Sequence, residues 1–157
     1  MSHPPTVMTP SLQTAAFLLN GAVLGAMFAL VAFAVRPFTR ELLFGLLVVA
    51  ALAYVVFALD APDPAPWLLV EVAGGAVYVA LGYRGLRGSL WWLVAGWALH
   101  PVWDAALHVA GPGAPFAPAW WAVPCVSFDL VVAGLVALPL ALRTHPALTP
   151  PLRSGAV

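Results

Sequence analysis

The stretch WALHPVWDAALH, residues 97–108, decides how the rest of this sequence is interpreted. It lies inside a hydrophobic run long enough to cross a membrane, yet it contains three ionisable side chains, His100, Asp104 and His108. Because they are spaced four residues apart, they form one polar stripe on an α-helix that drifts about 40° per step, with Trp97 on the same face. Ionisable groups at membrane depth are costly and usually serve a function. We therefore expect the chemistry of this protein at this stripe.

The composition is that of an integral membrane protein. Of the 157 residues, 63% are hydrophobic and 8% are charged, whereas about 25% of the residues in a soluble domain are charged. The formal net charge is zero, so no nucleic-acid partner is predicted. A single cysteine, Cys125, excludes an intramolecular disulfide. The expected partners are the lipid bilayer and a lipid or other apolar small molecule.

Five apolar runs reach the length of about 17–25 residues that a helix needs to span a bilayer. Strand-like alternation is absent, and open sheets cannot span lipid, so the predicted fold is an all-α bundle of five transmembrane helices. The predicted domain covers residues 15–142, between an N-terminal tail (1–14) and a flexible C-terminal tail (143–157). The spans are residues 15–35, 42–59, 67–86, 90–109 and 120–142.

The basic residues predict the orientation of the bundle. All six are arginine, and they lie in or beside the first loop, the third loop and the C-terminal tail. With five spans these segments share one side, which the positive-inside rule makes the cytoplasm. We therefore expect the N-terminus outside and the C-terminus in the cytoplasm. The lack of lysine and the abundance of Ala, Gly and Pro indicate a bacterial source. The expected location is therefore a bacterial inner membrane.

This topology gathers the polar residues of the spans in the outer half of the bilayer. At about 1.5 Å of rise per residue, Asp104 lies roughly 8 Å below the outer end of its helix and His108 lies at the surface. A polar pocket that opens outward, or towards the outer leaflet, is therefore predicted. The other residues expected in this half are Asn20, Tyr54, Glu71, His100, Cys125 and Asp129.

Two imidazoles and a carboxylate are suitable ligands for zinc or iron. His100 and His108 are about 12 Å apart along a straight helix, too far to share one ion with bonds of about 2.1 Å. A pair that includes Asp104 could share an ion with Glu71 or Asp129 from a neighbouring helix. A catalytic acid/base pair and a hydrogen-bonded network without metal are the alternatives, and the residues alone leave all three open.

The neighbouring helices supply candidate supporting residues. Asp129 matches His100 in depth, which predicts a pair between two helices, and Cys125 shares a face with Asp129. A lone cysteine is more often a small buried hydrophobe than a nucleophile. Glu71 either joins the cluster or lies at the lipid headgroups. Asn20 is expected to hydrogen-bond within the bundle.

The first span contains a GxxxG motif formed by Gly21 and Gly25. Such a motif lets another helix approach closely. The partner is either a second helix of the same chain or a second copy in a homo-oligomer, and the motif does not distinguish these alternatives.

The chain resembles a family of small multi-pass membrane proteins of unknown function, known mainly from bacteria. The likeness rests on a helix of the form His-x-x-Trp-Asp-x-x-x-His, a loop with Phe-x-Pro, and a Cys and an Asp near the start of the last helix. In the family that Cys and Asp are closer together than the four residues that separate them here. The matching residues are His100, Trp103, Asp104, His108, Phe116, Pro118, Cys125 and Asp129. The resemblance implies a membrane protein and supplies no activity.

Three functional hypotheses follow. The first is an enzyme that acts on a lipid or apolar substrate from the outer leaflet, with Asp104 and His100 or His108 as its acid/base pair. The second is a non-enzymatic protein that binds or helps to transport metal ions or protons. The third is a structural accessory subunit in which the polar cluster only fixes helix packing.

Overall fold

The computed structural model describes residues 9–142, and this part of the chain is all-α, without strands. The all-α prediction is therefore confirmed for these residues. The elements are α1 (Pro10–Ala34), α2 (Thr39–Phe57), the 3₁₀ helix η1 (Ala58–Asp60), α3 (Pro64–Arg87), α4 (Trp91–Trp103), the π-helix η2 (Asp104–Val109) and α5 (Ala119–Leu142).

The helices are those of a multi-pass membrane protein. Four segments are long and apolar enough to cross a membrane: α1, α2 together with η1, α3, and α5. The helix α4 has only 13 residues, and η2 continues it without a break. The predicted tail 1–14 is too long, because α1 begins at Pro10, where proline suits the first turn of a helix. The predicted tail 143–157 lies outside the described residues.

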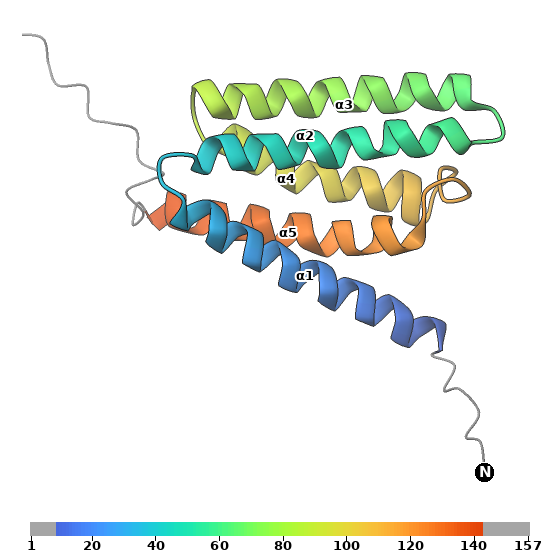
Figure 1. Cartoon of the computed structure of the whole chain (residues 1–157), viewed down its shortest axis with the longest axis horizontal. Coiled ribbons are helices and arrows are strands. Elements are labelled where there is room, and N and C mark those ends of the chain that lie inside the picture. Colours follow the sequence, from blue (N-terminus) through green and yellow to red (C-terminus); the bar gives the residue numbers. More distant parts are fainter. Residues whose placement is uncertain (1–8, 143–157) are drawn as a thin grey trace, which may run out of the picture.

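The helices form two pairs that α4 joins. Helix α1 packs along α5, α2 packs along α3, and α4 lies between α3 and α5 (Figure 1). The α1–α2 and α3–α4 connections lie at one end of the bundle, and the α2–α3 and α4–α5 connections lie at the other (Figure 1). We call the first the arginine end, because the four described arginines lie there: Arg36, Arg40, Arg84 and Arg87.

The interior changes in character along the bundle. Near the arginine end the core is apolar and includes the fully buried Leu43, Leu47, Leu93 and Val136. There the Arg40 guanidinium donates hydrogen bonds of 2.7 and 2.6 Å to the carbonyls at the end of α3, those of residues 85 and 88. The buried histidines and carboxylates of the described chain lie between the middle of the bundle and the opposite end, and they form the candidate site.

The glycine motif of α1 packs against α5 of the same chain. A Cβ atom at Gly21 would lie 2.0 Å from the carbonyl oxygen of Pro124, and one at Gly25 would lie 2.7 Å from that of Phe128. Only glycine permits this approach. Of the two alternatives, the structure of the single chain shows packing within the chain, and a homo-oligomer through Gly21 and Gly25 stays a prediction.

Candidate functional site

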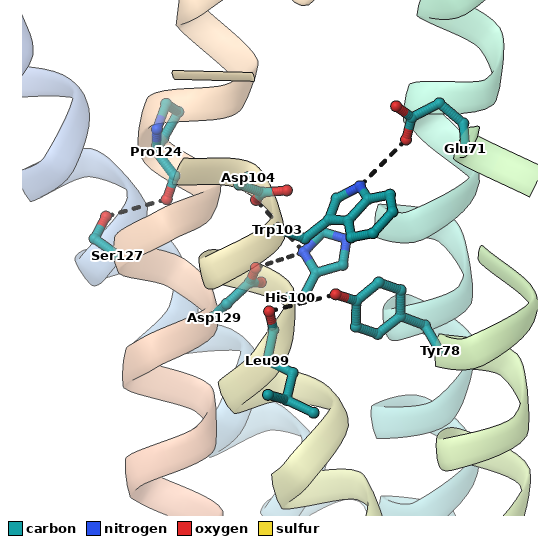
Figure 2. Close-up of polar contacts among 9 residues, drawn as sticks. All are labelled: Glu71, Tyr78, Leu99, His100, Trp103, Asp104, Pro124, Ser127 and Asp129. Carbon is teal, nitrogen blue, oxygen red and sulfur yellow. Dashed lines mark hydrogen bonds and ion pairs between the residues drawn. The ribbon is translucent and has the colours of Figure 1, made fainter. Parts of the chain in front are cut away.

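The centre of the site is an imidazole between two carboxylates. Nδ1 of His100 is hydrogen-bonded to Oδ2 of Asp129 at 2.7 Å, which joins α4 to α5 (Figure 2). The same Nδ1 lies 3.4 Å from Oδ2 of Asp104. All three residues are at most 1% exposed. The predicted pair between His100 and Asp129 is therefore confirmed, and Asp104 stands beside it.

Several polar atoms of this centre are buried without a hydrogen-bond partner. They include both carboxylate oxygens of Asp104, Oδ1 of Asp129 and Nε2 of His100. The indole Nε1 of Trp97, a fully buried residue packed against Phe28 and Phe128, is also unpaired. Buried polar atoms are normally hydrogen-bonded, so this concentration is unusual within the described part of the chain. The protein alone does not satisfy the centre.

The third member of the predicted stripe, His108, belongs to a second pair. Its Nε2 lies 3.0 Å from Oε1 of Glu71 on α3, and the indole of Trp103 donates a 3.3 Å hydrogen bond to Oε2 of the same carboxylate. His108 is 2% exposed and Glu71 1%. His108 is therefore buried inside the bundle, one residue before the end of η2, and its depth in the bilayer stays a prediction. Glu71 joins the buried polar residues.

The stripe divides because the helix changes its geometry after His100. Pro101 lies inside α4, and the chain continues from Asp104 as the π-helix η2. A π-helix has i→i+5 hydrogen bonds, so four residues turn its side chains through a smaller angle than four residues of an α-helix. His108 consequently turns towards α3, whereas His100 faces α5. A π-helical turn inside a helix is frequent at functional sites.

Two tyrosines pack against the imidazole rings of the site. The ring of Tyr54 on α2 stacks on His108, with centroids 3.8 Å apart and planes 9° from parallel, and its centroid lies 6.1 Å from that of His100. Its hydroxyl is buried without a hydrogen-bond partner. Tyr78 on α3 sets its ring edgewise to His100 at 4.9 Å and donates a 3.3 Å hydrogen bond to the carbonyl of Leu99 (Figure 2). The imidazoles are therefore held in aromatic surroundings.

A pocket of about 350 Å³ reaches this centre from the side of the bundle. It lies between α1, α2 and α5, and its lining includes Asp129, the half-buried Cys125 and the exposed Asn20 and Leu24. Asn20 lines the pocket, and its expected hydrogen bond within the bundle stays a prediction. Helix α1 diverges from α2 away from the arginine end (Figure 1), and residues of both helices line the pocket.

Most of the candidate residues were predicted, but two contacts were not. The sequence identifies Trp103 only as part of the motif and does not predict its hydrogen bond to Glu71. Gly74 was a signal for it, because a Cβ atom there would lie 2.6 Å from the Trp103 ring, which therefore needs a glycine opposite. Tyr78 shares a helix face with Glu71, but nothing in the pattern identified His100 as its neighbour.

A family model described as "Family of unknown function (DUF6010)" matches residues 16–139. The chain belongs to this family. The match covers α2, α3, α4 and η2 completely, most of α1 and α5, and every residue of both imidazole–carboxylate groups. No curated protein and no solved structure matches the chain.

Proposed function

We propose that this chain is a membrane-embedded enzyme that acts on a lipid or another largely apolar molecule. The observation that carries the proposal is the pocket, which runs from the side of the bundle to Asp129, a member of the buried centre. Binding pockets are typically concave and apolar with a few convergent polar groups. This one fits that description, because its lining is mainly apolar and its inner end is a carboxylate.

The proposed topology has five spans, in which α4 and η2 together form the fourth, with the N-terminus outside and the C-terminus in the cytoplasm. The arginine end supports this orientation, since the positive-inside rule places it on the cytoplasmic side. The membrane we propose is a bacterial inner membrane. In the proposed topology His108 and Glu71 lie in the outer half of the bilayer, near the end of η2 and in the first third of α3. The centre of His100 and Asp129 lies deeper, near the middle of the α4–η2 segment and of α5.

The pocket opens towards lipid and not towards water. Its rim residues Leu24, Val49 and Trp120 are 47%, 56% and 60% exposed on the outer surface of the bundle. In a membrane this surface faces acyl chains, so an apolar molecule can arrive by lateral diffusion. Its polar group would then meet Asp129 and, behind it, His100. An imidazole held by carboxylates can orient and polarise such a group, either directly or through a bound ion.

The same observations favour this proposal over a conduit or a purely structural cluster. A conduit needs polar groups across the whole membrane, and the described core near the arginine end is apolar around Leu43, Leu47 and Leu93. A structural cluster should satisfy its own hydrogen bonds, as the Glu71 carboxylate does with His108 and Trp103. The centre at Asp104 leaves both carboxylate oxygens without one.

The test uses lipid extracts and two matched tryptophan variants. Wild-type protein in detergent is incubated with a bacterial lipid extract, and bound and converted lipids are identified by mass spectrometry. We expect Leu24→Trp, which fills the pocket, to lose the bound lipid, and Leu30→Trp on the lipid-facing side of α1 to keep it. Asp129→Asn should keep binding but stop conversion. Equal lipid content in both tryptophan variants, or conversion that survives Asp129→Asn, would overturn the proposal.

A further inference from the structure

The two imidazole–carboxylate groups of this protein differ in whether their carboxylate oxygens have hydrogen-bond partners. In the pair of His108 and Glu71, both carboxylate oxygens have partners, since Trp103 donates to the second oxygen. In the group of His100, Asp104 and Asp129, two carboxylates face a single nitrogen, Nδ1, which carries at most one hydrogen. That hydrogen bond goes to Asp129, and Asp104 is left without one.

The unpaired carboxylate of Asp104 is 0% exposed. An ionised carboxylate in an apolar interior is strongly unfavourable unless it is paired or coordinates a metal. The Tyr54 side chain nearby brings no positive charge, and every described arginine lies at the far end of the bundle. The two carboxylates therefore lack a compensating positive charge. Among the described side chains, only His100 can carry one close to them.

We propose that His100, Asp104 and Asp129 bind one divalent transition-metal ion. Each residue offers a ligand atom, and these atoms all lie within 4.8 Å of one another. Ligands about 2.1 Å from a tetrahedral ion are about 3.4 Å apart, and the distance from His100 Nδ1 to Asp104 Oδ2 is 3.4 Å. The 2.7 Å contact between His100 and Asp129 would lengthen slightly as both turn towards the ion.

The charge and ligand types indicate which ion. Two carboxylates and a neutral imidazole form an uncharged complex with a divalent cation, which suits a low-dielectric interior. One nitrogen and two oxygens fit zinc, iron or manganese better than calcium or magnesium, which prefer six or more oxygen ligands. The three residues are buried, but Asp129 lines the pocket. A fourth ligand can therefore reach the ion from there.

The three proposed ligands are held in place by rigid helices and packed side chains. His100 and Asp104 come from consecutive turns at the junction of α4 and η2, and Asp129 comes from α5, so the ligands are supplied by rigid helices (Figure 2). Metal sites are more precise when helices hold their ligands. Tyr78 and Tyr54 pack against the imidazole, which limits its rotation.

The test measures metal directly and needs no substrate. Wild-type protein is purified in detergent without chelator, and zinc, iron and manganese are quantified per chain by mass spectrometry. We expect close to one ion per chain in the wild type and at least a tenfold loss in His100→Gln and in Asp104→Asn. The matched controls His108→Gln and Glu71→Gln change the same residue types in the other pair and should keep the ion.

A second measurement does not depend on any variant folding. Wild-type protein stripped with a chelator is titrated with Zn²⁺ and separately with Co²⁺, whose visible absorption reports its coordination. We expect one saturating equivalent, a rise in melting temperature with Zn²⁺ and a tetrahedral cobalt spectrum. Wild-type protein that carries no metal and binds neither ion would overturn the metal site, and leave a hydrogen-bonded network in which one carboxylate is protonated. Lipid binding in the pocket is measured separately, so either result stands without the other.

Discussion

Tyr54 and His108 lie face to face, with ring centroids 3.8 Å apart and planes within 9° of parallel. This stack joins α2 to η2 at the level of both imidazole–carboxylate groups. The phenol ring makes the contact, whereas the hydroxyl has no hydrogen-bond partner. The two parts of the side chain can therefore be tested separately.

We expect Tyr54→Phe to be nearly neutral and Tyr54→Ala to lower the free energy of unfolding by about 3 kcal/mol. The alanine variant loses the stack and leaves a cavity in a fully buried position. The phenylalanine variant keeps the ring and removes only an unpaired hydroxyl. Thermal unfolding in detergent measures both. Equal losses in the two variants would mean that the hydroxyl is the important group.

Glu71 and His108 should behave as a coupled pair. Removing either partner leaves the other buried without its hydrogen bond, and Glu71→Ala also releases the Trp103 indole. In a double-mutant cycle with Glu71→Ala and His108→Ala, we expect a coupling free energy of about 1–3 kcal/mol. Chemical unfolding in mixed micelles supplies the four values. Losses that simply add would show that the two side chains do not stabilise each other.

The close packing of α1 on α5 predicts opposite effects at two glycines. Gly21→Ala should lower the free energy of unfolding by about 2 kcal/mol, because its Cβ atom would overlap the Pro124 carbonyl. Gly134→Ala, with nothing within 4 Å of its Cβ position, should be neutral or stabilise α5 by about 0.5 kcal/mol. Both melting temperatures are measured in the same detergent. If Gly21→Ala instead alters only the oligomeric mass, measured by light scattering, α1 would be an interface between copies.

The proposed orientation predicts which loops a membrane-impermeant maleimide reaches in intact cells. In a Cys125→Ser background, Pro112→Cys in the α4–α5 connection should be labelled from outside. Arg36→Cys in the α1–α2 connection should be labelled only after the cells are broken, because the positive-inside rule places it in the cytoplasm. Labelling of both loops from the same side would contradict the five-span topology, since these loops would then be separated by an even number of spans.

The sequence by itself determined the properties that depend on one helix at a time. Apolar runs of spanning length predicted the helices, because lipid leaves the backbone no other way to satisfy its hydrogen bonds over such a length. The regular rise of a helix predicted depth, and equal depth was enough to pair His100 with Asp129. The spacing of four residues predicted that His100 and Asp104 share a face, and in the structure His100 Nδ1 lies 3.4 Å from Asp104 Oδ2.

Only the tertiary structure decided which way each helix is rotated about its axis and which helices pack against each other. The π-helix after Trp103 turned His108 away from Asp104 and towards Glu71, which a uniform α-helical stripe cannot represent. Packing of Gly21 on α5 set where α1 lies, and thereby placed Asn20 on a pocket that reaches Asp129. Periodicity and depth are local properties of the chain, whereas these contacts arise from side chains of several helices that compete for the same interior space.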